Sequence, residues 1–264
     1  MPLNKQLISN HLTLASRELI HDIQIFDSVT STNDVLHGQL KSNPQTITAI
    51  FAEMQTAGRG RQGRPWVSPA NTNIYFSLSW YFQKSISALS GISLVVGIAI
   101  VRALKIFGIS ESVKIKWPND ILFENKKLGG ILIESIAVDA CNTSLMIGVG
   151  LNINLSKENS DEITQPWTSL LKITGKLQDR NSLSALLLNQ LIEILPEFEK
   201  NGLAHFMLEW NSYDALLGKH CEIKTGSEYK SGIAAGINSS GELRLKTNEN
   251  TTETINSGEI ILSR

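Results

Sequence analysis

Apolar residues recur at helical spacing in five segments of the chain. The segments are residues 5–20, 33–40, 90–107, 183–198 and 203–213. Asn33-Asp34 is expected to start the second helix, because short polar side chains cap free backbone amides. The third segment is apolar nearly all round, which predicts a buried helix ended by Gly108. Pro196 is expected to kink or end the fourth helix.

Short apolar or alternating runs between these segments predict strands. They are residues 23–26, 46–52, 74–81, 114–117, 121–123, 128–135 and 144–149. Asn125-Lys126-Lys127 is expected to form a turn. Residues 155–167 are polar and show no periodicity, so we interpret them as a long mobile loop.

The pattern changes after about Gly218 to short strands separated by close turn signals, such as Ser239-Ser240-Gly241. These strands are residues 221–224, 230–237, 243–246 and 260–262. The chain is therefore predicted to have an α+β fold, in which a mixed sheet with packed helices precedes a small β-barrel. We expect a helical extension over residues 1–22, a large domain over 23–215 and the β domain over 216–264.

Composition indicates a soluble globular protein. The chain has 264 residues, of which 42% are hydrophobic and 19% charged, with a formal net charge of −1. It therefore lacks a global basic field that would attract nucleic acid. Cys141 and Cys221 have no metal-ligand or redox spacing, which indicates reduced thiols in a cytoplasmic protein. The N-terminus has no signal-peptide run, and the most apolar stretch, residues 92–104, is shorter than the ~20 residues of a membrane span.

A segment rich in glycine and arginine, GRGRQGRPW, occupies residues 58–66. Glycine lets main-chain N–H groups approach an anion, and arginine presents a fork of donors that matches carboxylate and phosphate oxygens. The segment is suited to hold two anions together, although a disordered nucleic-acid tract or a solvated loop has a similar composition. Trp66 and the strand after it argue against disorder. The P-loop lysine and Ser/Thr pattern is absent, so a nucleotide would be held in another way.

Two further segments combine a lysine with a turn. In Lys116-Trp117-Pro118-Asn119-Asp120, the lysine is suited to neutralise a phosphate and Asp120 to hold magnesium or orient an amine. A surface turn with an exposed ion pair is the alternative. Lys127 precedes Gly129 and Gly130 at the start of an apolar strand, which places it at the mouth of the core unless it is a simple hairpin lysine.

Two more segments carry weaker signals. Gly148 and Gly150 end a strand and would let a flat ligand ring lie against the backbone, while Asn152 both donates and accepts hydrogen bonds. A tight turn explains the same residues equally well. Ser31-Thr32-Asn33, taken alone, is explained as a helix N-cap.

In this order and spacing, the blocks GRGRQGRPW, KWPND, KLGGILIE and GVGLNIN resemble those of the biotin–protein ligase family. The resemblance extends from about Asp27 to the C-terminus. It implies a class II synthetase-like catalytic domain followed by an SH3-like domain. It also implies an activity: biotin is activated with ATP to biotinyl-5′-AMP, with release of pyrophosphate. The biotin then passes to a lysine of a biotin carrier protein of the acetyl-CoA carboxylase type.

The resemblance also implies roles for individual residues. The implied biotin-binding residues are Ser31, Thr32, Asn33, Gln55, Gly58, Arg59, Gly60, Arg61, Lys127, Gly129, Gly130, Gly148 and Gly150. The predicted ATP or adenylate-binding residues are Arg61, Arg64, Trp66, Lys116, Asn119, Asn152 and Trp167. Lys127, Arg59 and Arg61 are the predicted catalytic residues. Mg²⁺ is expected with ATP, and apart from Asp120 no dedicated protein metal site is expected.

The chain departs from many bacterial members in one respect. Thirty residues precede Ser31, whereas a helix-turn-helix DNA-binding domain needs roughly twice as many. We therefore expect a ligase that does not bind DNA as a repressor. Members with that domain dimerise, and a homodimer is one of the states left open for this chain.

Three rival functions share part of this pattern. A lipoate–protein ligase uses the same chemistry but lacks the GRGR loop with its tryptophan. A Gly/Arg-type RNA-binding protein predicts a basic chain with repeats of that segment, and neither is present. A regulatory biotin sensor would bind biotin without turnover. The five histidines share no motif, which agrees with a reaction that needs no protein nucleophile.

Overall fold

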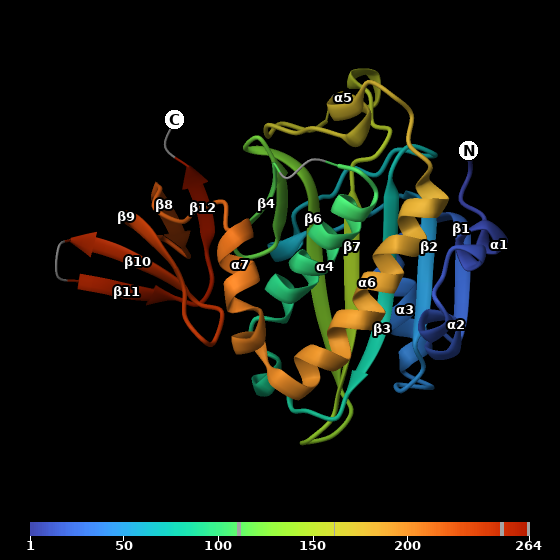
Figure 1. Ribbon diagram of the computed structural model, residues 1–264, viewed down its shortest axis with the longest axis horizontal. Coiled ribbons are helices and arrows are strands. Elements are labelled where there is room, and N and C mark those ends of the chain that lie inside the picture. Colours follow the sequence, from blue (N-terminus) through green and yellow to red (C-terminus); the bar gives the residue numbers. More distant parts are fainter. Residues whose placement is uncertain (110–111, 161, 249–250, 263–264) are drawn as a thin grey trace.

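The computed structural model describes residues 1–109, 112–160, 162–248 and 251–262. A seven-stranded sheet forms the larger part, with the order β1-β2-β3-β7-β6-β5-β4 (Figure 1). Its strands are β1 (Asp22–Val29), β2 (Thr48–Gln55), β3 (Ile74–Phe82), β4 (Val113–Lys116), β5 (Asp120–Phe123), β6 (Lys126–Ala137) and β7 (Thr143–Leu151). β1 and β2 run parallel, and the other neighbouring strands are antiparallel. The predicted mixed sheet is confirmed.

Helices cover both faces of this sheet. On one face, α4 (Ile92–Ile106) packs against α6 (Arg180–Asn201) and the strands (Figure 1). On the other face lies α3 (Thr32–Leu40). Successive side chains of a strand point to opposite faces of the sheet, so β2 contributes to both layers. Phe51 packs in the main core, whereas its neighbour Ile50 packs with Leu36 under α3. The α+β class is therefore confirmed.

The most apolar segment is a core helix. Residues Ile86–Ile106 are long and apolar enough to cross a membrane by length and composition. Most side chains of α4 within this segment are buried between the sheet and α6. Gly97 lets α4 lie close to the sheet, since a Cβ there would lie 3.1 Å from the Ile115 side chain on β4. The predicted helix over 90–107 is thus confirmed, with Gly108 just after its end at a φ of 91°.

One helix prediction is wrong, and of the two outcomes predicted for Pro196 the end of the helix is not observed. The single helix expected over residues 5–20 is two helices, α1 (Lys5–Asn10) and α2 (Leu14–Leu19). The Thr13 hydroxyl caps the second by accepting from the Ser16 amide at 3.2 Å. Pro196 does not end its helix, because α6 continues to Asn201. Burial of Leu195 and Phe198 on either side of the proline holds the helix together despite the missing N–H.

Two later segments are refined by the structure. The helix expected over residues 203–213 is a 3₁₀ turn, Leu203–Phe206, followed by α7 (Met207–Tyr213). The loop expected over residues 155–167 contains a 3₁₀ turn, Lys157–Asn159, and precedes the short helix α5 (Leu170–Thr174). Asp161 within that loop lies outside the described residues.

The C-terminal part is a five-stranded antiparallel sheet with the order β11-β10-β9-β8-β12. Its strands are β8 (His220–Thr225), β9 (Glu228–Ile237), β10 (Leu243–Asn248), β11 (Thr251–Ile255) and β12 (Glu259–Leu262). The sequence pattern missed β11, because this edge strand is mostly polar and exposed. The turn between β9 and β10 contacts the larger part, where Trp117 Nε1 donates to the Gly241 carbonyl at 2.9 Å. The smaller sheet is therefore anchored beside the KWPND turn.

Candidate functional site

A cavity of about 440 Å³ opens where the ends of several elements meet. Loop 58–66, the turn after β4, the ends of β6 and β7, loop 162–167 and the start of β12 all contribute to its wall. Most of the sequence-predicted residues line it. They are Ser31, Thr32, Asn33, Gln55, Arg59, Gly60, Arg61, Arg64, Trp66, Lys116, Asn119, Asp120, Lys127, Gly130, Gly148, Gly150, Asn152 and Trp167.

Two predicted residues, Gly58 and Gly129, do not line the cavity. A Cβ on Gly129 would lie 2.2 Å from the Leu151 side chain, and one on Gly58 would lie 2.6 Å from the Trp66 carbonyl. Both glycines therefore permit close packing behind the wall rather than access for a ligand. Whether such a glycine faces the cavity or packs behind its wall depends on which segment lies against it, and local sequence does not show that.

The glycines of β6 and β7 make room for protein side chains. A Cβ on Gly150 would lie 2.6 Å from the Trp66 indole, and one on Gly130 would lie 3.2 Å from the same ring. A Cβ on Gly148 would lie 2.7 Å from Asn33 Oδ1. The flat ring that rests against this glycine backbone is thus the indole of Trp66, which forms part of the cavity wall.

One end of the cavity carries neutral hydrogen-bonding groups. The Thr32 amide donates to Gln55 Oε1 at 2.9 Å, and Gln55 Nε2 donates to Ser68 Oγ at 3.1 Å. The Ser77 hydroxyl contacts Thr32 Oγ1 at 2.7 Å and Asn33 Oδ1 at 2.5 Å. Ser31 occupies the N-cap of α3, but its side chain makes no capping bond. Ser31 therefore occupies the N-cap position as predicted, but its hydroxyl does not cap the helix.

The opposite end is cationic. Lys127 Nζ lies 2.8 Å from Asp120 Oδ1, and Lys116 Nζ lies 3.5 Å from Asp120 Oδ2. Asp120 is largely buried, with 14% of its side chain exposed. Two lysines therefore share one carboxylate and leave a net positive charge. The backbone of Lys127 is fixed by loop 162–167, because its amide donates to the Pro166 carbonyl at 2.9 Å.

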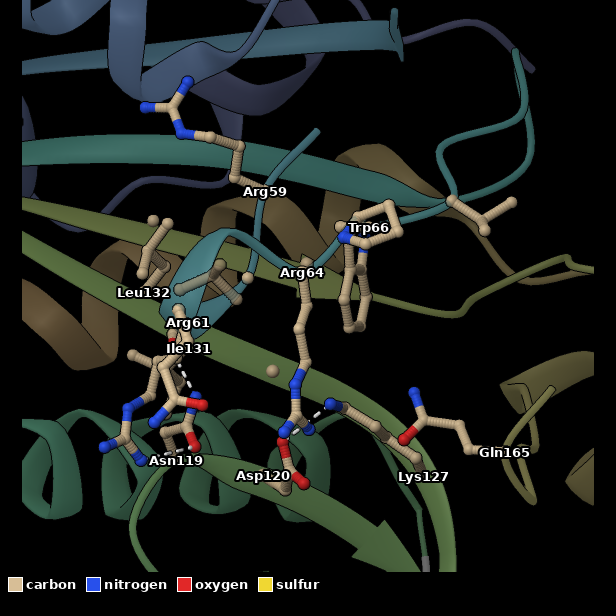
Figure 2. A pocket seen from close by; sticks show the side chains of 18 of the residues that line it. Arg59, Arg61, Arg64, Trp66, Asn119, Asp120, Lys127, Ile131, Leu132 and Gln165 are labelled. Carbon is tan, nitrogen blue, oxygen red and sulfur yellow. Dashed lines mark hydrogen bonds and ion pairs between the residues drawn. The ribbon is translucent and has the colours of Figure 1, made fainter. Parts of the chain in front are cut away.

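Arg61 extends toward the cationic end (Figure 2). Left-handed backbone at Gln62 and Gly63, with φ of 57° and 70°, forms the tight turn that follows it. Its Nη1 donates to Asn119 Oδ1 at 3.5 Å, and among the described residues no carboxylate forms an ion pair with it. Burial lowers the pKa of the Arg61 guanidinium, and the charge of Asp120 opposes this shift. A half-buried cation without a paired anion is suited to receive one from a ligand.

Arg59 extends in a different direction from Arg61 and Arg64 (Figure 2). Its guanidinium forms a fork with Asp34 on α3, with both contacts at 2.8 Å, and lies 3.5 Å from Glu134 on β6. The hydrogen bond from Arg59 lowers the pKa of the Asp34 carboxyl. Thus Arg59 lines the cavity as predicted, but its charge is already matched by two carboxylates.

Several residues beside the site are not among its sequence-predicted residues. Asp34, Glu134 and Ser77 lie just outside its neutral end, where they contact Arg59 or Asn33, and Glu259 on β12 pairs with Arg64 at its mouth. Glu134 is the last residue of the KLGGILIE block, so its position in that block is a sequence signal for a residue near the site. Glu259 lies in another sheet, and no local pattern connects it to the arginine loop. Within the described residues, no group of three or more His, Cys, Asp or Glu side chains is placed to hold a metal ion.

Two family models and several known proteins match this chain. The model of the biotin/lipoate A/B protein ligase family matches residues 25–154, and that of the biotin protein ligase C-terminal domain matches residues 216–263. The chain is 34% identical over 227 residues to the bifunctional ligase/repressor BirA of Escherichia coli, covering 85% of this chain and 69% of that protein. It is 31% identical over 200 residues to a biotin–[acetyl-CoA-carboxylase] ligase of Paracoccus denitrificans, covering 75% and 83%.

A solved structure shares the fold over nearly the whole chain. The biotin protein ligase of Aquifex aeolicus, in complex with biotin and ATP, superposes with a TM-score of 0.75 and 30% sequence identity. The match covers 92% of this chain and 99% of the other. The fold, both domain matches and the level of identity agree: the chain belongs to the biotin–protein ligase family.

Proposed function

We propose that this protein activates biotin with ATP and transfers it to a lysine of a biotin carrier protein of the acetyl-CoA carboxylase type. The observation that carries the proposal is the polarity of the cavity, which has a neutral amide and hydroxyl end and a cationic end. Biotin has a neutral ureido head and a carboxylate tail, and ATP adds phosphates next to that tail. A relative is named for this activity, and the Aquifex aeolicus structure holds both biotin and ATP.

We assign the ureido end of biotin to Ser31, Thr32, Asn33 and Gln55, whose side chains offer donors and acceptors at the neutral end. The backbone at Gly60, Gly130, Gly148 and Gly150 would flank the rest of the molecule. Gly58 and Gly129 would act only by allowing the wall to pack closely.

The adenylate would occupy the cationic end. Its predicted contacts are Arg61, Arg64, Trp66, Lys116, Asn119, Lys127, Asn152 and Trp167. A biotin carboxylate oxygen attacks the α-phosphorus, the bond to the bridging oxygen breaks, and pyrophosphate leaves. Both reactants are anions, so neutralising charge and fixing geometry are the main tasks. The guanidinium of Arg61, which no carboxylate pairs among the described residues, and the ammonium of Lys127 are the groups that we assign to the first task.

Magnesium is expected to arrive with ATP as part of the substrate. Asp120 does not fit the role of a protein ligand for the metal, because Lys127 and Lys116 engage its two oxygens. In this proposal Asp120 instead positions the two lysines. A second role that we propose for Asp120 is to orient the acceptor amine.

The second step needs no protein nucleophile. The acceptor lysine nitrogen attacks the carbonyl carbon of biotinyl-AMP, the bond from that carbon to the AMP oxygen breaks, and the amine loses a proton. Loops 58–66 and 155–167 would exclude water from the anhydride until the acceptor arrives.

Several broader assignments belong to the same proposal. Residues 1–22 would be a helical extension, 23–215 the catalytic domain and 216–264 the SH3-like domain. We propose a cytoplasmic enzyme that does not act on DNA, and leave its oligomeric state to measurement. A lipoate ligase is less favoured, because the Paracoccus denitrificans relative and the Aquifex aeolicus structure are both named for biotin.

The direct test incubates the protein with ATP, magnesium, a purified biotin carrier domain and either biotin or lipoate. Mass spectrometry of the carrier then shows which acid is attached, and pyrophosphate release reports the first step. We expect biotin addition at one lysine. Absence of pyrophosphate release with biotin would contradict the proposal, and modification with lipoate alone would favour the rival ligase. Biotin binding without pyrophosphate release would favour a sensor.

A further inference from the structure

Three charged side chains meet just outside the neutral end of the cavity. Arg59 comes from loop 58–66, Asp34 from the first turn of α3 and Glu134 from β6. Arg59 contacts Asp34 through two nitrogens at 2.8 Å, which is the fork geometry of strong guanidinium–carboxylate pairs. Glu134 Oε1 lies 3.5 Å from the same guanidinium.

Glu134 also contacts the neutral end directly. Its Oε2 accepts a hydrogen bond from Asn33 Nδ2 at 2.6 Å, while Asn33 Oδ1 receives the Ser77 hydroxyl at 2.5 Å. Asn33 is 3% exposed, so these contacts fix which atom of its amide faces which neighbour. One N–H and one lone pair of this amide are left for a ligand.

We propose that Asp34, Arg59 and Glu134 form a positioning clamp for biotin binding. In this clamp, Arg59 holds loop 58–66 and the Asn33 amide in position and does not contact the reacting anions. The proposal rests on the proposed function. Asp34 and Glu134 match the charge of Arg59, so it has little left to offer a carboxylate or phosphate. The clamp instead ties loop 58–66 to α3 and β6, and through Glu134 it holds the orientation of Asn33.

A double-mutant cycle tests this assignment, using pyrophosphate release to give the KM for biotin and kcat. Arg59→Ala and Asp34→Ala should each raise the KM for biotin by about 10-fold, with kcat within about 3-fold of wild type. The double variant should be no worse than Arg59→Ala, because Asp34 has already lost its guanidinium partner in that variant. Glu134→Ala should raise the same KM through Asn33.

Arg102 and Glu209 provide the matched control. They form a comparable fork between α4 and α7, with contacts at 2.9 and 2.6 Å, and neither lines the cavity. Glu209→Ala should leave the KM for biotin unchanged. Asp34→Asn and Arg59→Lys, which keep size and polarity, replace the alanine variants if those lose their folded state.

Trypsin gives a readout that does not require activity. Cleavage of the Arg61–Gln62 bond should be about 10-fold faster in Asp34→Ala, because the loop is released from α3, and unchanged in Glu209→Ala. If wild type releases no pyrophosphate, the proposed function fails while this result still tests the clamp.

Three kinetic outcomes would overturn the assignment. One is a loss of about 100-fold or more in kcat for Arg59→Ala with Asp34→Ala near wild type, which would make Arg59 a ligand of the reacting groups. Another is wild-type kinetics and wild-type cleavage in all variants. The last is multiplication of the two single effects in the double variant, which would show that the residues act independently.

Discussion

Arg64 and Glu259 join the arginine loop to the first residue of β12 although 195 positions separate them in the sequence. Arg64 Nη1 donates to Glu259 Oε1 at 2.7 Å, and Nη2 pairs with Oε2. The pair raises the pKa of Arg64 and lowers that of Glu259, mainly through the hydrogen bond itself. Gly258, Glu259 and Ile260 also line the cavity. The smaller domain therefore completes the mouth of the site.

Reversing one charge of this pair should weaken nucleotide binding. We expect Glu259→Lys to raise the KM for ATP by about 10-fold, because it repels Arg64 and loosens the loop. Combining it with Arg64→Glu should recover part of the loss. Glu253→Lys in β11, which breaks the Lys230–Glu253 pair of the same domain, is the control. A wild-type KM for ATP in Glu259→Lys would show that the contact does not support the site.

Lys127 should be required for the first step. Its ammonium, held at 2.8 Å from Asp120, is one of the main positive charges at the reacting end. Lys127→Ala should lower the rate of pyrophosphate release by about 100-fold or more, the scale of losing a key electrostatic donor. Lys126→Ala, one residue earlier and exposed, is the matched control. Near-normal release by Lys127→Ala would remove this residue from the site.

We expect Arg61 to keep biotinyl-AMP bound in the site in addition to helping it form. In Arg61→Gly the half-buried cation is lost, so biotinyl-AMP should still form but escape into solution. Chromatography of the filtrate after ultrafiltration would detect free biotinyl-AMP. Arg61→Lys, which keeps the charge but not the fork, should leak less. Complete retention by the glycine variant would contradict this role.

The contact between Gly150 and Trp66 should tolerate no side chain. A Cβ at Gly150 would lie 2.6 Å from the indole, so Gly150→Ala must displace Trp66 from the cavity wall. We expect a loss of stability of about 1–3 kcal/mol, together with a shift in tryptophan fluorescence. Gly38→Ala is the control, because nothing lies within 4 Å of a Cβ there. Unchanged fluorescence in Gly150→Ala would mean that the ring is not held as described.

A buried ion pair should dominate the stability of the N-terminal region. Arg180 and Glu53 are 2% and 5% exposed, and Glu53 Oε1 also accepts from the Leu3 amide. Breaking the pair with Glu53→Ala leaves a buried guanidinium uncompensated, so urea unfolding should show a loss of about 3–5 kcal/mol. Glu18→Ala, at an exposed position of α2, should be neutral. A loss below about 1 kcal/mol in Glu53→Ala would indicate that water or other groups compensate Arg180.

Local patterns predicted most elements correctly because periodicity reports which side of an element is buried. The pattern over residues 90–107 predicts a helix correctly because α4 is apolar on nearly all sides and lies in the core. Errors arose where distant contacts outweigh local preference. Thr13 divides the first helix while its amide donates to Asn189 on α6 at 3.0 Å, and burial of Leu195 and Phe198 carries α6 past Pro196.

The sequence by itself determined the family, most of the elements and most of the predicted residues that gather at the cavity, because those depend on motifs and their spacing. Only the tertiary structure decided which partner each of the three arginines of loop 58–66 contacts. Arg59 turns to Asp34 and Glu134, and Arg64 reaches Glu259 in another domain. Arg61 contacts Asn119 and has no carboxylate partner in the part of the chain that the structure describes. The physical reason is that a guanidinium's role follows from the carboxylates around it, and those come from remote parts of the chain.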